Sequence, residues 1–476
     1  MLLVGVTGPI GSGKTSLLLQ LATWFQQQHK GVEGFLALGV NRSAENRGAD
    51  SYRLQMIASG RDLLYATRDD AKLSPYIFDS RTESQLREWA EQIKSKGAPA
   101  LIILDEFGPL EASGKGHVQL WDAIRSSNPP LVVIVVRSGL VPEIEKILQM
   151  QFDVCIDIQE KEAWNKLRTI CVEHDDWKRI GSYGAAAGSF EASIGAMLHT
   201  AQVPFRGIAL SSVQSMVMTY AGDGLGARGK VVWVPFISAG IKALSPAGDR
   251  LNPMLAISAQ GILYTCAIQL LGWNVLGVTL GGFLIGAWAA AQGVILQFLF
   301  IGGDLVHVYD VILRWIADKL HLPPIGLIGL FFIWTSIAGI FSSALTLYSY
   351  KRRHRIPARL QQLLLEGAVR FIAEESKRSW KVTFKQSLHD LTRPFFWAPI
   401  CIIIIMVMVS GSSIENVFWI AVRATTIAMV VFSFARAFEP RAFLGWLRKR
   451  GYWGPAYAFR LVFLSKNKKE ENDRIP

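Results

Sequence analysis

Apolar residues follow two different patterns along this chain. Up to about residue 180, short apolar runs alternate with charged stretches, whereas long uncharged runs dominate from Gly184 onward. Short apolar runs bounded by turn residues are typical of buried strands, and runs near 20 residues are typical of membrane-spanning helices. The pattern therefore predicts an α/β domain, with a parallel sheet and flanking helices, followed by an all-α polytopic transmembrane domain.

In the first region we expect strands over 2–6, 34–40, 101–104 and 131–136, and a helix over 16–25. In the second region we expect membrane spans over 184–201, 207–221, 230–246, 253–272, 275–301, 324–349, 395–411 and 415–438. The first of these spans is rich in small residues, which permit close helix packing. Alternatively, 184–201 lies at the membrane interface and 275–301 is broken in two.

The charge pattern supports a membrane protein. Only 18% of residues are charged and the net charge is +12, with basic clusters beside the spans at 351–355 and 448–450. Such clusters mark cytoplasmic loops, so we favour membrane topology over nucleic-acid binding. Residues 360–371 have the pattern of an amphipathic helix, which could lie on anionic lipid or contact the N-terminal domain. The four cysteines form no C-x-x-C pair and suggest neither a zinc site nor a disulfide framework.

A glycine-rich segment, GPIGSGKT, lies between the first expected strand and the first expected helix. The G-x-x-x-x-G-K-[ST] motif requires this context, because the loop N–H groups and the helix N-terminus then face phosphate oxygens. Lys14 is expected to reach the β- and γ-phosphates, and the Thr15 hydroxyl to bind Mg²⁺. The residues predicted to bind the nucleotide are Gly8, Pro9, Ile10, Gly11, Ser12, Gly13, Lys14, Thr15 and Ser16.

Two acidic residues close the apolar run 101–104. A central strand that ends in carboxylates would deliver them to the phosphate end of the sheet. Asp105 is expected to hold Mg²⁺ through water, and Glu106 to orient or deprotonate the attacking water. The simpler interpretation, a solvated acidic turn after a strand, loses weight beside a complete glycine loop.

Three arginines could approach the γ-phosphate. Arg137 ends the run 131–136, whereas Arg42 and Arg47 lie in a polar loop after 34–40. We predict that Arg137 is catalytic together with Lys14 and Glu106; the alternative is that Arg137 lies in solvent. Either Arg42 or Arg47 could act as an arginine finger, in cis or between protomers. The sequence has no motif specific for adenine or guanine, and in particular no N-K-x-D guanine signature. The expected substrate is therefore ATP or GTP.

GPIGSGKT, the segment 34–49 and DEFGPLE over 105–111 together resemble the small P-loop nucleoside-triphosphatases first named from thermophiles. The resemblance departs at 48–50, where Gly-Ala-Asp stands in place of the family's Gly-Phe-Asp. It implies Mg²⁺-dependent hydrolysis of a nucleoside triphosphate, and it adds Glu111 to the site region. From the residues alone, Glu111 could instead cap the next helix.

Polar residues inside membrane spans are costly and often functional. The candidates are Glu191, His199, Gln214, Lys242, Gln260 and Gln269. A buried Lys242 would need a carboxylate partner, for which Glu191 is a candidate; alternatively, Lys242 reaches the interface from the end of its span. Segments 199–210 and 241–260 give a pattern-level resemblance to the substrate-binding membrane subunits of energy-coupling-factor vitamin transporters, which implies a small solute.

We therefore expect six parts: a P-loop NTPase domain over 1–165, a charged linker over 166–183, a six-helix transmembrane domain over 184–350, a basic amphipathic cytosolic segment over 351–393, a transmembrane hairpin over 394–440 and a basic cytosolic tail over 441–476. The predicted function couples Mg²⁺-dependent hydrolysis of ATP or GTP to uptake or gating of a small solute. The alternative is a membrane-anchored NTPase switch without transport. The expected location is a bacterial inner membrane, with the NTPase domain in the cytoplasm. The expected partners are nucleoside triphosphate, membrane lipid and a solute, and a second copy could assemble with the first; no nucleic acid is expected.

Overall fold

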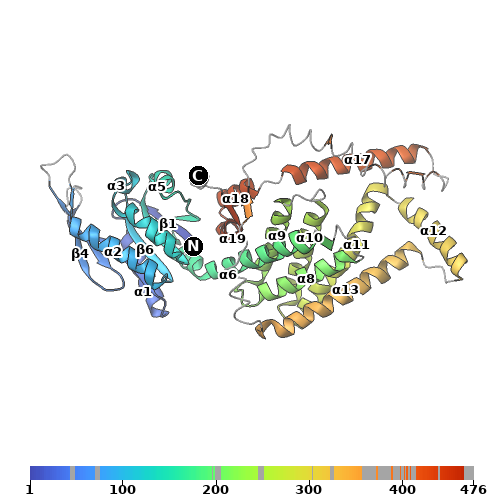
Figure 1. Ribbon diagram of the computed structural model, residues 1–476, viewed down its shortest axis with the longest axis horizontal. Coiled ribbons are helices and arrows are strands. Elements are labelled where there is room, and N and C mark those ends of the chain that lie inside the picture. Colours follow the sequence, from blue (N-terminus) through green and yellow to red (C-terminus); the bar gives the residue numbers. More distant parts are fainter. Residues whose placement is uncertain are drawn as a thin grey trace, which may run out of the picture. The chain divides into compact units, whose positions relative to one another are not determined.

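The N-terminal apolar runs form one eight-stranded sheet in a computed structural model of the chain (Figure 1). Its parallel part runs in the order β2 (Val32–Arg42), β6 (Leu101–Phe107), β7 (Leu131–Arg137), β1 (Leu2–Gly8) and β8 (Val154–Asp157). The apolar side chains of β1, β6 and β7 are almost fully buried, as in sheets that are covered on both faces. The four strands expected from the sequence are confirmed.

Beyond β2 the sheet is antiparallel. There β3 (Ala49–Met56), β4 (Asp62–Arg68) and β5 (Tyr76–Phe78) follow one another toward the edge. The sheet is thus mostly parallel, as the sequence pattern predicted, with an antiparallel extension beyond β2. The physical reason is the short turn between β3 and β4, where Met56 N donates to Arg61 O (2.8 Å), because a parallel pair needs a crossover of a dozen or more residues.

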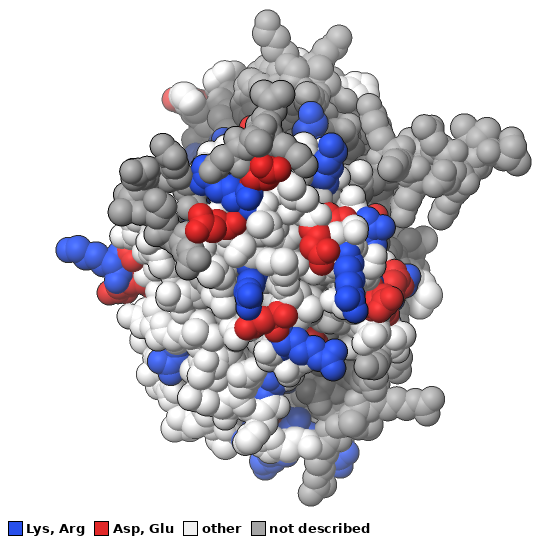
Figure 2. Space-filling model, turned by 90° about the vertical axis from the view of Figure 1, so that its left-hand side faces the viewer, with Lys and Arg blue, Asp and Glu red and all other residues white. Residues whose placement is uncertain are grey.

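The helices between the strands of this region are 4 to 17 residues long. The ones that pack with the sheet are α1 (Lys14–Gln27), α2 (Ser80–Lys96), α3 (Pro109–Ala112), the 3₁₀ helix η1 (Gly116–Leu120), α4 (Trp121–Ser127) and α5 (Val141–Leu148). On the face drawn in Figure 2, Lys and Arg are interspersed with Asp and Glu, as is typical of a solvated surface.

The structure describes residues 1–42, 49–69, 76–195, 197–198, 205–244, 251–302, 304–321, 326–355, 371–373, 388–389, 397, 401, 404–405, 408, 414–437 and 440–465. They form two compact units, of which the first is Met1–His174 with Arg448–Tyr457. This unit extends beyond the expected boundary at 165, and its later residues Leu167, Ile170 and Cys171 are buried. The second unit is Asp175–Leu447 with Ala458–Pro476.

The segment expected as a charged linker is helical. It belongs to α6 (Ala163–Phe190), a single helix in which the boundary between the two units falls. Within the first unit, the Arg168 guanidinium lies over the Trp24 ring of α1 at 5.7 Å. Within the second, Arg179 donates to carbonyl oxygens of another helix. A π-helical turn, η2 (Glu191–Gly195), follows α6.

A short segment near the C-terminus completes the first unit. It begins at Arg448, the ninth residue of α18 (Pro440–Lys449), and runs into α19 (Trp453–Val462). Arg448 Nη2 lies 3.8 Å from Asp153 Oδ1, whose side chain is fully buried. Asp153 Oδ2 also accepts from Leu3 N (2.9 Å). Strand β1 is therefore connected through one carboxylate to a residue that follows the long segment Asp175–Leu447 of the helical unit in the sequence.

The second unit is helical in its described residues, apart from two three-residue strands, β9 (Phe371–Ala373) and β10 (Phe463–Ser465). Its helices are α8 (Arg206–Gly222), η3 (Arg228–Val232), α9 (Trp233–Leu244), α10 (Leu251–Leu271), α11 (Val275–Ile301), α12 (Asp304–Leu320), α13 (Leu327–Arg352), η4 (Arg353–Arg355) and α17 (Ile414–Ala437). Among the residues that the structure describes, three stretches of helix are long and apolar enough to cross a membrane: Pro253–Leu271, Val275–Leu299 and Leu327–Arg352.

The other expected spans have varied outcomes. The spans over 207–221 and 230–246 correspond to α8 and the short α9, and 415–438 corresponds to α17. Most of 395–411, most of the amphipathic pattern at 360–371, and His199 lie outside the described residues. The sequence pattern missed α12, because it carries charges along its length and so lacks a long uncharged run.

Small and hydroxyl-bearing residues hold the helical unit together. A Cβ on Gly286 of α11 would lie 2.3 Å from Ala338 O of α13, so only glycine permits this approach. Buried hydroxyl groups add bonds between helices: Thr346 Oγ1 donates to Ser215 Oγ (2.7 Å). The unit therefore has the packing chemistry of helices in lipid, where small residues and interhelical hydrogen bonds replace the hydrophobic driving force.

The expected pair of Lys242 and Glu191 is present. Lys242 Nζ lies 3.6 Å from Glu191 Oε1 and donates to Glu191 O (3.3 Å). The Lys242 side chain is only 3% exposed, so it does not reach the interface. Two other candidates on α8 and α10, Gln214 and Gln260, are also buried, whereas Gln269 is exposed.

Candidate active site

The glycine loop connects the end of β1 to the start of α1. Gly13 has φ 90° and precedes α1, a conformation that favours glycine. A Cβ on Gly8 would lie 2.5 Å from Ile158 Cγ2, so the loop closes against the segment after β8 only if residue 8 is glycine. Helix α1 begins with no side-chain cap and no acidic residue in its first turn. Its first-turn N–H groups thus lack a side-chain cap, as in helices that bind an anion at their N-terminus.

Lys14 is held within the loop. Its Nζ donates to Gly8 O (2.9 Å) and Pro9 O (2.6 Å). Ser12 Oγ also donates to Pro9 O (2.8 Å), whereas Ile10 is largely exposed. The loop oxygens thus hold the ammonium beside the N–H groups, close to where phosphate oxygens would lie. The structure brings the predicted nucleotide-binding residues together in one turn.

Asp105 meets Thr15 at the phosphate end of the sheet. Thr15 Oγ1 donates to Asp105 Oδ2 (2.8 Å), which also accepts from Ala37 N (3.1 Å). Burial raises the pKa of the Asp105 carboxyl, against the hydrogen bonds from Ala37 and Thr15. A hydroxyl and a carboxylate side by side are the hard oxygen donors that Mg²⁺ prefers. These two residues fit the ion that the sequence predicted for them.

Glu106 follows Asp105 in a conformation that is rare for its residue type. It has φ 68°, in the left-handed region, and its side chain is exposed. The pairing of β6 with β7 shifts register here, between Leu104 and Phe107. A non-glycine residue in this region costs on the order of 1 kcal/mol and persists only when its surroundings hold it there. The irregular strand end turns Asp105 inward and Glu106 outward.

Of the three candidate arginines, the structure describes the side chain of Arg137 alone. The Arg137 side chain is exposed at the end of β7, and Arg137 pairs in register with Gly8, the first residue of the glycine loop. The Arg42 side chain and the whole of Arg47 lie outside the described residues. Arg137 thus lies on the strand that neighbours the loop.

Sequence reasoning left the position of Glu111 open and missed His117. Glu111 is buried and accepts from Gly108 N (2.8 Å) and His117 N (3.3 Å), so it caps α3 and fixes the segment after Glu106. The His117 ring stacks on Tyr65 at 4.6 Å, and burial lowers its pKa to about 3, which keeps it neutral. Glu111 stands at the third helical position, from which a glutamate side chain can reach back to the N-cap N–H, but nothing local in the sequence marks His117 as buried.

A phosphate loop between a central parallel strand and a helix, with a neighbouring strand that ends in Asp-Glu, defines the class of P-loop NTPases. Comparison with known proteins agrees: residues 3–170 match the family model described as NTPase. The N-terminal domain is therefore a P-loop nucleoside-triphosphatase domain. The match ends within α6, and the comparisons give no support to a likeness between the helical unit and energy-coupling-factor subunits.

Individual relatives cover the same portion. Nucleoside-triphosphatase THEP1 of Sulfolobus acidocaldarius is 27% identical over 136 residues, which is 28% of this chain and 76% of that protein. The protein of the same name from Picrophilus torridus is 25% identical over 162 residues, or 33% of this chain and 87% of its own length. No solved structure matches the chain.

Proposed function

We propose that the N-terminal domain hydrolyses ATP or GTP with Mg²⁺ and that the helical unit places this activity in a membrane. The observation that carries the proposal is the Thr15–Asp105 hydrogen bond at the mouth of an intact glycine loop, next to an exposed Glu106. The purified full chain is expected to release phosphate from either nucleotide, and EDTA is expected to stop this release. Undiminished hydrolysis after chelation would contradict the metal-dependent mechanism.

The residues have separate roles in this mechanism. Loop N–H groups and Lys14 bind the phosphates, and Lys14 exchanges its bonds to Gly8 O and Pro9 O for phosphate oxygens. Thr15 and Asp105 would hold Mg²⁺, which neutralises charge on the phosphates. Glu106 orients the attacking water and accepts its proton. Arg137 would stabilise charge on the γ-phosphate from the neighbouring strand.

The buried Asp105 carboxyl gives a pH dependence to the stability of the nucleotide-free protein. Because burial raises its pKa, the folded state binds the proton more tightly than the unfolded chain, whose carboxyl has a pKa of about 3.9. The contribution of this carboxyl to the free energy of unfolding is therefore fully present below about pH 3.9, and it is lost as the pH rises through the raised pKa of the folded state. Asp105→Asn is expected to raise the melting temperature of the N-terminal unit at about pH 8 and to change it little below about pH 4. A lower melting temperature at both pH values would contradict this assignment.

For the membrane part, we propose that hydrolysis drives or gates the passage of a small solute. The support is the buried pair of Lys242 and Glu191 beside the π-helical turn, since ionisable groups and helix breaks in membrane segments mark substrate or ion sites. A switch that is only anchored needs no such pair. The proposed site of action is a bacterial inner membrane with the NTPase domain in the cytoplasm, in agreement with the basic clusters beside the spans.

Helix α6 is the proposed path for coupling, because it contacts α1 through Arg168 in one unit and α8 through Arg179 in the other. In nanodiscs, Lys242→Ala or Glu191→Gln is expected to change the hydrolysis rate of the full chain several-fold, because linked sites share one coupling free energy. Two glycines inserted between His174 and Asp175 are expected to abolish that effect. Equal rates in wild type and all variants would favour the anchored switch.

A further inference from the structure

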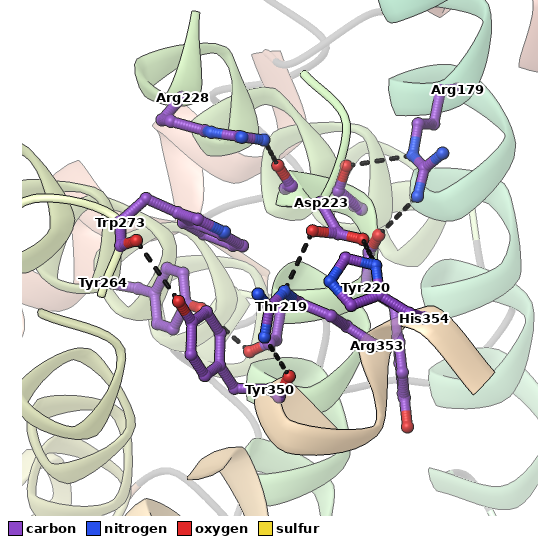
Figure 3. A network of polar contacts seen from close by, with 12 residues as sticks. Arg179, Thr219, Tyr220, Asp223, Arg228, Tyr264, Trp273, Tyr350, Arg353 and His354 are labelled. Atoms are coloured by element: carbon purple, nitrogen blue, oxygen red, sulfur yellow. Dashed lines mark hydrogen bonds and ion pairs between the residues drawn. The ribbon is translucent and has the colours of Figure 1, made fainter. Parts of the chain in front are cut away.

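Arginine side chains connect the loops at one end of the helical unit (Figure 3). Arg179 donates to the carbonyl oxygens of Tyr220 (Nη2, 2.8 Å) and Ala221 (Nε, 3.1 Å) at the end of α8. Arg353, just after α13, donates from Nε to Asp223 Oδ1 (3.1 Å). Cations at a helix C-terminus satisfy its last carbonyl groups and oppose its dipole. Three segments that are distant in the sequence thus share one end of the bundle.

Two further contacts complete this end. Lys230 of η3 pairs with Asp176 of α6 (2.9 Å), and Tyr350 of α13 donates to Trp273 O in the turn between α10 and α11 (3.3 Å). The shared end therefore consists of the stretch of α6 after Asp175, the segment between α8 and α9, the α10–α11 turn and the end of α13. Successive helices run back and forth between this end and the opposite one, where Lys242 meets Glu191.

The two ends differ in charge. Figure 3 labels Arg179, Asp223, Arg228 and Arg353 at one of these ends. By their positions in the sequence and their contacts, Asp175, Asp176 and Asp223 are outnumbered there by seven cationic residues that we call the basic rim: Lys178, Arg179, Arg228, Lys230, Lys351, Arg352 and Arg353. At the opposite end, cations and carboxylates are balanced among the described side chains: Arg206 and Lys242 stand against Glu191 and Asp310, of which Asp310 accepts from Leu327 N at the start of α13. An excess of cations at one end is typical of a helical bundle whose basic end faces the anionic leaflet of a membrane.

Aromatic rings accompany the cations of the basic rim. Five cation–π pairs occur there: Arg353 over Tyr350 (4.0 Å), Arg352 over Tyr348 (4.7 Å), Arg228 over Trp273 (5.1 Å), Arg179 over Tyr183 (5.3 Å) and Lys230 over Trp177 (5.5 Å). Such pairs occur about once per 70–80 residues on average, so this end is strongly enriched. Tryptophan and tyrosine concentrate at the depth of lipid headgroups, and the stacked cations would lie at that depth as well.

We propose that the basic rim binds the phosphate headgroups of anionic phospholipids. Arg179, Arg228 and Arg353 maintain the shape of the rim, because they donate to carbonyl oxygens of the bundle itself. Lys178, Lys351 and Arg352 are half-buried or exposed, and their charges face the headgroups. The proposal rests on the membrane insertion proposed above, and it adds the class of lipid and the residues that recognise it.

The test compares the full chain in micelles of equal phosphatidylglycerol and phosphatidylcholine content by native mass spectrometry. Wild type is expected to retain phosphatidylglycerol preferentially. The triple variant Lys178→Gln, Lys351→Gln, Arg352→Gln is expected to lose that preference at least about tenfold, since each cation near an anionic surface contributes on the order of fivefold. The matched control removes three exposed cations of the first unit, Arg81→Gln, Lys94→Gln and Arg125→Gln, and is expected to keep the preference.

Three kinds of outcome would overturn the proposal. An unchanged preference in the triple variant, or an equal loss in the control, would show that the basic rim does not select lipids. Release of the lipid by millimolar soluble glycerol phosphate would indicate a site for a free anion. Failure of the wild type to insert into nanodiscs of either lipid would reject the proposed membrane insertion itself. This failure differs from the other outcomes, because they can be observed only with inserted protein.

Discussion

Glu106→Gln is expected to lower the turnover number for nucleotide hydrolysis at least about 10²-fold, the scale for loss of a general base. Nucleotide affinity is expected to stay unchanged, because phosphate binding comes from the loop N–H groups and Lys14. Glutamine has the size and flexibility of glutamate, so it can occupy the same exposed position at φ 68°. Single-turnover phosphate release and equilibrium nucleotide binding, both measured on the full chain, separate the two effects.

Two further variants test whether the loss of turnover is specific to the proposed general base. Lys14→Ala is expected to lose nucleotide binding itself, which distinguishes a phosphate ligand from a base. Glu143→Gln removes an exposed carboxylate in the first turn of α5 and is expected to hydrolyse at the wild-type rate. If Glu106→Gln also turned over at that rate, Glu106 would have no part in the chemistry.

Arg448→Ala is expected to destabilise the first unit by about 3 kcal/mol, because it removes a cation that lies 3.8 Å from the buried Asp153 carboxylate. The amide of Leu3, which donates to the same carboxylate, is expected to exchange with solvent faster. Hydrogen exchange on the full chain measures this opening at β1 directly.

The neighbouring Lys449→Ala removes an exposed cation of the same helix and is expected to leave exchange at Leu3 unchanged. Combining Arg448→Met with Asp153→Asn removes both charges and is expected to recover most of the lost protection, since replacing a whole buried pair is far less costly than breaking it. Equal exchange in Arg448→Ala and wild type would mean that the contact does not stabilise β1.

The glycine loop could be predicted from sequence because everything it needs is local. Its strand, its turn and its helix occupy consecutive positions, and Gly13 with Lys14 and Thr15 follows a fixed spacing. Asp105 lies 90 residues from Thr15, yet it too was predictable, since the strand that carries it has an unmistakable apolar run. A motif on a buried parallel strand is informative because the sheet determines where the strand ends.

Other parts of the fold depend on partners that no local pattern specifies. The antiparallel strands β3 to β5 carry mixed polar and apolar residues, so their pairing depends on β2 and on short turns. His117 lies in η1, and it is buried because the rings of Tyr65 on β4 and Phe35 on β2 pack against it. Lys242 and Glu191 were matched by opposite charge alone, which succeeds when a span contains few ionisable groups.

The return of the chain to its first unit has a consequence for the order of synthesis. Residues Arg448–Tyr457 leave the ribosome only after the whole of Asp175–Leu447 has been made. The strands and the glycine loop can assemble early, but the Asp153 carboxylate receives Arg448 only after the segment Asp175–Leu447 has been made. The contact that stabilises β1 therefore forms only on molecules in which this segment of the helical unit is present, and a product that stops before Arg448 would carry a weakened β1.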